Sequence, residues 1–289
     1  MELHLQRTAW TDYLALAKPR VVLLHLITAG AAMFLAAKGS PPVSILLFTL
    51  VGGALMVSSS NALNCYIDRY IDGMMVRTRN RPLPAGRLRA RQAMAFGVVI
   101  GFIGLLILSQ LVSLAAATMA AGALIYYIVV YTLWLKRRTS WSAVIGSGAG
   151  AFPPLIGWIA VTGTVGVTPL ILFAVVALWS PPHFWALAIS RRNDFKNVGL
   201  GVMPARNTRR WIVLFSLLLV ATSLLLVPIA HLGFIYLGAA CIMGFGFLAL
   251  ALQLLYRADS HSARRLFSYS IMFLIILFVA MLIDRLVFL

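Results

Sequence analysis

Residues 62–83, ALNCYIDRYIDGMMVRTRNRPL, place two aspartates directly after an apolar run and directly before several arginines. Asn64, Asp68 and Asp72 recur at intervals of four, so on an α-helix they lie along one face. The intervening Arg69 projects about 100° away from Asp68 around such a helix. Only seven residues of the chain are acidic, and two carboxylates held this close repel each other unless a cation lies between them.

The composition around this stretch predicts an all-α polytopic membrane protein. Of the 289 residues, 62% are hydrophobic and only 11% are charged, whereas soluble domains are about half apolar and about a quarter charged. Inside a bilayer the backbone must satisfy its own hydrogen bonds, which favours helices. Cys65 and Cys241 both lie in apolar segments and indicate neither a disulfide framework nor a metal site. A net charge of +17 could suggest nucleic acid, but basic membrane loops account for it and we expect no nucleic-acid partner.

Nine segments are long and apolar enough to span a membrane. They cover residues 21–37, 43–66, 91–110, 112–135, 141–162, 167–189, 211–230, 233–256 and 267–287. Basic residues gather before the first span and after the second, fourth, sixth and eighth, while the alternate loops are nearly bare apart from Lys38. This alternation predicts a single domain, 1–289, in the cell inner (cytoplasmic) membrane, with its N-terminus in the cytoplasm and its C-terminus outside.

Residues 1–19 carry charge as far as Lys18 and lack the small-residue cleavage site of a signal peptide. Trp10, Tyr13, Leu14 and Leu16 fit a short helix lying at the membrane surface and ending at Lys18-Pro19. The alternative is a flexible tail.

The row of Asn64, Asp68 and Asp72 suits Mg²⁺, which binds carboxylate and amide oxygens and often substrate phosphates. Arginines, whose planar guanidinium groups bind phosphate, follow the two aspartates directly. They favour a metal-bound polyphosphate over a metal ion alone as the ligand of this site. The alternative is that Asp68 and Asp72 have simply left the bilayer and are neutralised by the arginines at 77, 79 and 81.

Two further basic loops, KRRTSW (136–141) and SRRNDFKN (190–197), lie on the same predicted side. Arg191 and Arg192 are therefore candidate diphosphate contacts. Asp194 stands among these cations and could complete a second metal site, or it could be a solvated loop aspartate. We expect Asp259 and Asp284 to be ordinary interfacial charges.

Two spans contain helix-breaking residues, in GSGAGAFPPLIGW (146–158) and LWSPPHFWALAI (178–189). Kinks of this kind favour a wall that lines a central cavity, although tight helix packing would also explain them. His183 is flanked by aromatic residues inside a span and is a candidate haem-iron ligand or proton carrier, with a merely hydrogen-bonded histidine as the alternative. His25 is a second candidate, and we expect no such role for the remaining three histidines.

The motif Asn64-x₃-Asp68-x₃-Asp72, followed by RTRNRPLPAGR (77–87), resembles the first aspartate motif of the UbiA superfamily of intramembrane prenyltransferases. Four further stretches resemble the branch of that superfamily that farnesylates protohaem IX. These stretches are AKPRVVLL (17–24), DRYIDGMMVRTRNRPLPAGR (68–87), KRRT (136–139) with IGSGAGAFPPLIGW (145–158), and SPPHFWALAI (180–189). They occur in order along almost the whole chain.

The resemblance implies nine transmembrane helices around a central cavity that opens toward the cytoplasmic side. It implies transfer of farnesyl from farnesyl diphosphate to a vinyl group of haem B, with water addition, giving haem O. Mg²⁺ is then the cofactor and haem B a substrate. Asn64, Asp68 and Asp72 would hold Mg²⁺ and the diphosphate. Further diphosphate contacts are implied for Arg77, Arg81, Lys136 and Arg137.

The resemblance also implies a second polar loop centred on Asp194, where this chain departs from the family pattern. Phe195 follows Asp194, Gly201 replaces a proline, and Met203 precedes Pro204, so the detail of this second motif is in doubt. Handover of the product to a haem A synthase or a terminal oxidase is implied by the resemblance alone.

Three other functions are compatible with parts of this pattern. A related UbiA-type prenyltransferase would act on a quinone precursor. A transporter for an anionic solute would use broken helices, but its charges would lie at the membrane midplane instead of at one face. A haem-binding or assembly protein without chemistry would explain the histidines and leave Asp68 and Asp72 without a role.

Overall fold

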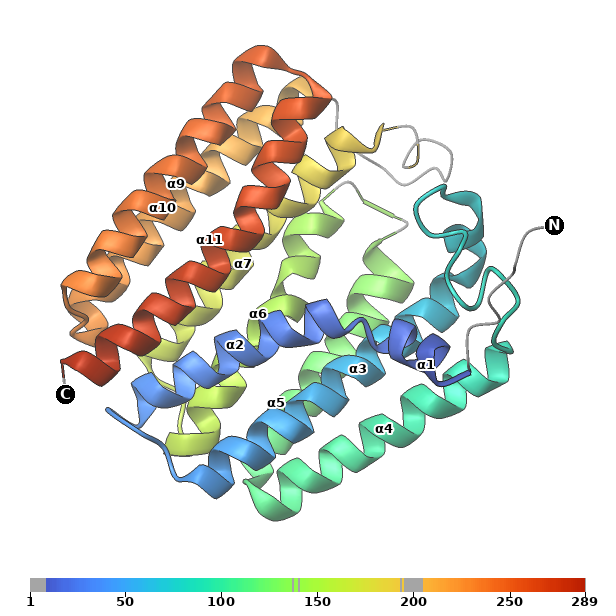
Figure 1. The fold of residues 1–289 in the computed structure, drawn as a ribbon, viewed down its shortest axis with the longest axis horizontal. Helices are drawn as coiled ribbons and strands as arrows, with labels where there is room; N and C mark the ends of the chain where they lie inside the picture. The colour runs from blue at the N-terminus through green and yellow to red at the C-terminus, as the bar shows by residue number, and fades with distance from the viewer. Residues whose placement is uncertain (1–8, 137, 140, 193, 195–204, 289) are drawn as a thin grey trace.

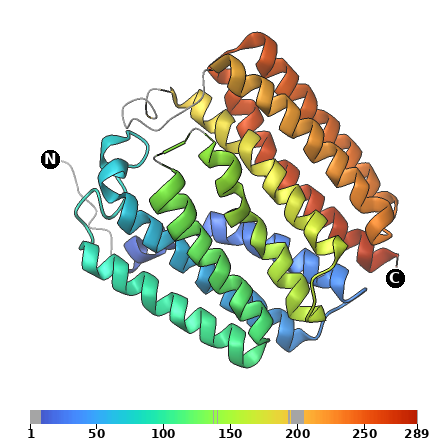
Figure 2. The same ribbon diagram turned by 180° about the vertical axis from the view of Figure 1, so that it is seen from behind.

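The apolar segments form long helices that run side by side and reverse direction from one to the next (Figures 1 and 2). The computed structural model describes residues 9–136, 138, 139, 141–192, 194 and 205–288. The helices are α1 (Ala9–Ala17), α2 (Pro19–Ala36), α3 (Val43–Met74), α4 (Ala90–Leu111), α5 (Leu114–Ile125), η1 (Tyr126–Leu135), α6 (Ser142–Thr162), α7 (Val167–Ser190), α9 (Ala205–Ala230), α10 (Phe234–Arg257) and α11 (Ser260–Val287). Within the described residues, nine segments are long and apolar enough to cross a membrane, which confirms the predicted count.

Several helices extend beyond the apolar segments that predicted them. Helix α3 continues to Met74, eight residues past the expected end, and α11 begins at Ser260 instead of residue 267. Helix α11 can start this early because the Asp259 carboxylate accepts a hydrogen bond from the Ser262 amide, at 2.6 Å. Hydropathy locates only the part of a helix that lipid surrounds, so the polar turns at its ends are missed.

The fourth span changes its helical form halfway along. Helix α5 continues as η1, a π-helix of ten residues. Its wider turn is visible in the Lys136 amide, which donates to the Tyr131 carbonyl five residues earlier at 2.9 Å. Such π-helical turns are rare and occur frequently at functional sites. Here the π-helix ends at Leu135, directly before Lys136, whose side chain reaches α3.

The glycine-rich segment of α6 provides close packing between helices. A Cβ atom at Gly157 would collide with the Ala29 carbonyl of α2, and one at Gly146 would collide with the Tyr131 ring of η1. The Pro-Pro pairs at 153–154 in α6 and 181–182 in α7 are all buried, and both helices continue through them. Tight packing therefore explains Gly146 and Gly157 but not Gly150, where a Cβ atom would meet nothing within 4 Å. The predicted cavity and its side stay predictions.

The helix ends that flank the basic segments all lie at one end of the bundle, which we call the polar end. There α1 begins, α3, η1, α7 and α10 end, and α4, α6, α9 and α11 begin, whereas α11 ends at the opposite end (Figure 1). Successive spans run in opposite directions. With nine spans, the first therefore begins at one end of the bundle and the last finishes at the other. The orientation of the bundle in a membrane stays a prediction.

Helix α1 is anchored at the polar end. Leu16 is buried in a cluster with Ala62 and Cys65 of α3. The Asp12 carboxylate accepts from Arg87 Nε at 3.0 Å, and Asn61 of α3 donates to the Ala17 carbonyl at 3.0 Å. The predicted short helix ending at Lys18 is thus confirmed, and the flexible-tail alternative is wrong for residues 9–17.

Asp284 corrects the expectation of an ordinary interfacial charge. Its side chain is buried, with 2% of the residue exposed. The carboxylate accepts from the backbone amides of Gly233 at 2.6 Å and of Ile235 and Tyr236 at 3.1 Å. Asp284 of α11 therefore caps the start of α10, and it satisfies amides that the helix itself leaves unpaired.

Replacing Asp284 tests this cap. Asp284→Ala leaves three backbone donors without their charged acceptor, and we expect a loss of about 3 kcal/mol in the free energy of unfolding. Thermal unfolding in detergent measures it. Asp259→Ala, which removes an exposed cap from α11, is the control and should lower the melting temperature less. Equal shifts for the two variants would contradict the structural role assigned to Asp284.

Candidate active site

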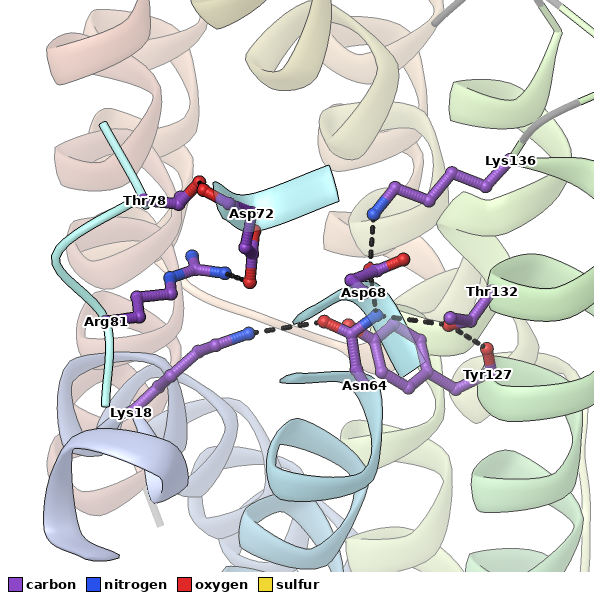
Figure 3. A network of polar contacts seen from close by, with 9 residues as sticks. All are labelled: Lys18, Asn64, Asp68, Asp72, Thr78, Arg81, Tyr127, Thr132 and Lys136. Atoms are coloured by element: carbon purple, nitrogen blue, oxygen red, sulfur yellow. Dashed lines mark hydrogen bonds and ion pairs between the residues drawn. The ribbon is translucent and has the colours of Figure 1, made fainter. Parts of the chain in front are cut away.

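The predicted row of polar side chains on α3 is present and turned into the bundle. Asn64, Asp68 and Asp72 are all buried, at 5%, 1% and 5% exposed, and Figure 3 shows them one above another on the same helix. Arg69, in contrast, is turned away, because its guanidinium lies over the rings of Tyr66 and Tyr70. The fourfold spacing therefore creates one buried acidic face, as expected.

Asp68 is the most buried member of the row. Its Oδ2 accepts from Lys136 Nζ at 2.5 Å and from Asn64 Nδ2 at 2.8 Å. The amide of Asn64 also lies 3.3 Å from Thr132 Oγ1, which donates in turn to the Tyr127 carbonyl (Figure 3). Asp68 Oδ1 is buried and has no hydrogen-bond partner among the described residues. A buried carboxylate oxygen without a donor is costly, so this atom favours the approach of a cation.

Asp72 lies one turn further toward the polar end. Its Oδ2 forms an ion pair with Arg81 Nη1 at 2.6 Å, and Thr78 Oγ1 donates to its backbone carbonyl at 2.8 Å. Both partners come from the α3–α4 loop, which therefore folds back over the end of α3. Both acids are buried in the bundle, and the Asp72–Arg81 pair agrees with the alternative that arginines neutralise them. The position of the acids relative to a bilayer stays a prediction.

Lys18 is a site residue that the sequence analysis missed. It joins α1 to α2 in the left-handed conformation, with φ 54° and ψ 67°, and its Nζ lies 3.5 Å from Asn64 Oδ1. Burial lowers the pKa of Lys18, and the nearby charges of Arg81 and Lys136 act in the same direction. The sequence did offer one indication of this role, because Lys18 precedes a proline on the predicted basic side. The sequence does not predict the left-handed turn that points the side chain toward the site.

Asp194 lies at the same end of α3. Asp194 is buried, and its Oδ1 accepts from the Val76 amide at 3.3 Å. Loss of hydration lowers the pKa of Arg77, the charges of Arg81 and Arg191 lower it further, and Asp72 and Asp194 oppose this change. The structure thus brings Arg77, Arg191, Asp72 and Asp194 into one electrostatic neighbourhood.

The remaining predicted site residues lie elsewhere or outside the description. Arg192 is exposed beside Arg191 at the end of α7. Arg137 and the atypical residues 195–204 lie outside the described residues. His25 lies on α2, where its Nδ1 is 2.7 Å from the Val21 carbonyl, and His183 lies on α7 against α11, where its Nδ1 is 2.7 Å from Ser270 Oγ.

This arrangement suits a polyanion held together with a metal ion. In the part of the chain that is described, no group of three or more His, Cys, Asp or Glu side chains converges as a metal site. Asn64, Asp68 and Asp72 stay the candidate ligands on the chemistry of their side chains, because they offer the hard oxygen atoms that Mg²⁺ prefers. The surrounding cations outnumber the carboxylates, and they come from four separate segments: Lys18, Arg77 with Arg81, Lys136, and Arg191. Excess positive charge in a partly buried site favours an anionic ligand.

Comparison with known proteins agrees with this arrangement. The UbiA prenyltransferase family model matches residues 25–277. A protoheme IX farnesyltransferase of Roseiflexus sp. (strain RS-1) is 43% identical over 281 residues, which cover 96% of this chain and 53% of that protein. The chain therefore spans about half the length of this relative. A protoheme IX farnesyltransferase of Symbiobacterium thermophilum is 44% identical, with 94% of this chain and 93% of that protein covered.

Solved structures share the fold at lower identity. A digeranylgeranylglyceryl phosphate synthase structure has a TM-score of 0.78 at 18% identity and covers 96% of this chain and 98% of its own. A UbiA homologue from Archaeoglobus fulgidus, bound to GPP and Mg²⁺, has a TM-score of 0.62 at 15% identity and covers 93% of this chain and 99% of its own. These likenesses confirm the predicted all-helical fold.

The backbone of Lys18 can be tested apart from its charge. A left-handed conformation is unfavourable for every residue except glycine. The Lys18→Gly variant should therefore be more stable than the Lys18→Ala variant, by about 1 kcal/mol in the free energy of unfolding. Thermal unfolding in detergent measures this difference. The exposed Lys38 has φ 52° at the opposite end of the bundle, so the same pair of substitutions there is a matched control. If alanine and glycine were equivalent at position 18, the left-handed turn would not be a feature of the folded protein.

Proposed function

The chain belongs to the UbiA prenyltransferase family, and we propose that it transfers a farnesyl group from farnesyl diphosphate to a vinyl group of protohaem IX (haem B), with addition of water, giving haem O. The observation that carries this proposal is the buried acidic face of α3, met by cations from separate segments at one end of a membrane bundle. The name of the curated relatives supports haem B as the acceptor. The alternative of a quinone precursor is not favoured.

We propose Mg²⁺ as the cofactor, held by Asn64, Asp68 and Asp72. Two features support this fit: the all-oxygen donor set, and Asp68 Oδ1, which is buried and receives no hydrogen bond from the described residues. A homologue from Archaeoglobus fulgidus has been solved with GPP and Mg²⁺. When bound, Mg²⁺ supplies charge neutralisation to the diphosphate leaving group. A contribution of Asp194 to a second metal position is part of the same proposal.

The cations around the acids would hold the diphosphate. Lys136 and Arg81 pair with Asp68 and Asp72, and Lys18 lies beside Asn64. With their partner side chains engaged by Mg²⁺, these three cations would be free to pair with phosphate oxygens without leaving the site. Arg77, Arg137, Arg191 and Arg192 are proposed as further contacts. Their positive charge is in place before the reaction and stabilises the negative charge that grows on the leaving oxygen as the C–O bond breaks.

The hydrophobic helices would exclude water while the farnesyl group is transferred to haem B. An allylic cation reacts with water, so transfer needs a dry site in which the vinyl carbon attacks before solvent does. Attack moves the positive charge to the carbon beside the porphyrin, where water adds its oxygen and releases a proton. His25 and His183 are proposed to contact haem B, and for His183 the alternative is positioning of that water molecule.

The proposed setting is the inner (cytoplasmic) membrane, with the polar end in the cytoplasm. The alternation of basic loops supports this orientation. A farnesylated haem is poorly soluble in water, so we propose handover within the bilayer to a haem A synthase or a terminal oxidase. A transporter is less well supported, because the acidic face belongs to the polar end of α3 instead of the middle of the bundle.

The reaction can be assayed directly. Membranes that contain the protein, incubated with farnesyl diphosphate, haem B and Mg²⁺, should yield haem O, detected by mass spectrometry, and chelation of Mg²⁺ should stop its formation. Asp68→Asn and Asp72→Asn should each lower kcat by at least about 100-fold, because each removes a charge that binds the metal and diphosphate. Asp259→Asn, at an exposed helix cap far along the chain, is the matched control. Wild-type rates in either variant of the acidic face would discard the metal site.

The cations should act mainly on prenyl diphosphate recognition. We expect Lys136→Ala and Arg81→Ala each to lower kcat/KM by about 100-fold, since each removes one charged contact to the diphosphate and leaves a buried carboxylate unpaired. Lys18→Ala should weaken binding of farnesyl diphosphate, whereas Lys38→Ala at the opposite end should not. Binding is measured by calorimetry in detergent with Mg²⁺ present. Unchanged affinity in all three site variants would contradict the proposed diphosphate position.

A further inference from the structure

His183 is held in one orientation by two helices. Its ring stacks on Trp179, one turn earlier on α7, with centroids 4.6 Å apart and planes 23° apart. The other neighbour is Phe267 of α11, also at 4.6 Å between centroids. His183 Nδ1 lies 2.7 Å from Ser270 Oγ, and Trp179 Nε1 donates to the Ser270 carbonyl at 2.6 Å. The ring is therefore fixed by stacking and by a hydrogen bond to a buried serine.

These contacts define which ring nitrogen carries the proton. Ser270 Oγ lies 2.6 Å from the Phe267 carbonyl oxygen, and a carbonyl can only accept a hydrogen bond. The serine hydroxyl therefore donates to Phe267, so its oxygen accepts from His183. The proton of the neutral imidazole is then on Nδ1, and the lone pair is on Nε2. His183 is only partly buried, and no described residue donates a hydrogen bond to Nε2.

This arrangement is the one found around histidines that bind metals. Such a histidine donates one ring N–H to an oxygen, which fixes the tautomer and the ring plane, and binds the metal through its other nitrogen. Imidazole is a common axial ligand of haem iron. Trp179 and Phe267 lie against the two neighbouring sides of the imidazole and restrict its rotation, which keeps Nε2 in one direction.

The position of His183 along its helix fits the proposed reaction. It lies seven residues before the end of α7, about 10 Å from that end. Asp68 lies six residues before the end of α3, about 9 Å from that end. Both helices end at the polar end of the bundle, so the imidazole and the acidic face lie at similar depth. This similar depth along the bundle is compatible with a haem on His183 and a diphosphate at the acidic face.

We propose that His183 Nε2 ligates the iron of protohaem IX, and that Ser270 is a positioning residue that fixes the tautomer of this imidazole. The inference rests on the proposed function and deepens it, because it replaces the water-positioning role of His183 with an iron ligand. His25 is not assigned this role. Its Nδ1 also lies 2.7 Å from an oxygen, the Val21 carbonyl of its own helix, but among the described residues no aromatic ring stacks on it and no second helix holds it.

Spectroscopic titration tests the ligand without depending on turnover. Full-length protein in detergent is titrated with ferric haem B, and the Soret band and the electron paramagnetic resonance spectrum report iron ligation. Wild type should give the spectrum of imidazole-ligated haem, and His183→Ala should lose it. Added imidazole should restore that spectrum in His183→Ala, which a merely structural histidine would not allow. His231→Ala, in the α9–α10 turn, is the matched control and should bind haem as wild type does.

Variants of Ser270 test the positioning role. Ser270→Ala should weaken haem affinity by about 10- to 100-fold, the usual cost of removing the partner of a metal-binding histidine, and Ser270→Thr, which keeps a hydroxyl group, should restore much of it. An unchanged imidazole-ligated spectrum in His183→Ala, with haem O still formed, would overturn the iron assignment and leave the proposed function standing. Absence of both haem binding and haem O formation in wild type would instead remove the proposed function and the iron ligand with it.

Discussion

Two carboxylates buried four residues apart on one helix repel each other strongly, and the fold must supply cations to meet them. Lys136 reaches Asp68 from the end of the π-helix, and Arg81 reaches Asp72 from the loop that follows α3. Lys18 arrives from the junction of α1 and α2. Because burial of an unpaired charge is costly, the acidic face fixes the positions of segments that are distant in sequence.

This mutual neutralisation is the basis of the proposed chemistry. Lys136 and Arg81 stabilise the buried carboxylates in the protein alone, and in the proposed function the same two cations would pair with a metal-bound diphosphate. The Asp12–Arg87 pair and the buried Leu16 hold α1 in place beside these side chains. The N-terminal helix is therefore part of the site's construction and not an appendage to the bundle.

Sequence reasoning reached the features that depend on periodicity and hydropathy. The nine spans, the basic polar end, and the single face of Asn64, Asp68 and Asp72 all follow from local patterns, and the structure confirms each of them. The missed features depend on tertiary contacts. The position of Lys18 depends on one left-handed backbone conformation, and that of Lys136 on the ten-residue π-helix before it. Asp284 accepts hydrogen bonds from amides about 50 residues away in the chain. None of these is encoded in the spacing of residue types.

In the proposed function, the acidic face of α3 would exchange Lys136 and Arg81 for a metal-bound diphosphate. This exchange can be seen in a structure of the protein with Mg²⁺ and a non-reactive farnesyl diphosphate analogue. We expect a metal ion at about 2.0–2.1 Å from oxygens of Asp68 and Asp72, with Lys136 and Arg81 moved onto the phosphate oxygens. Bound analogue far from α3, with both carboxylates still paired to Lys136 and Arg81, would contradict it.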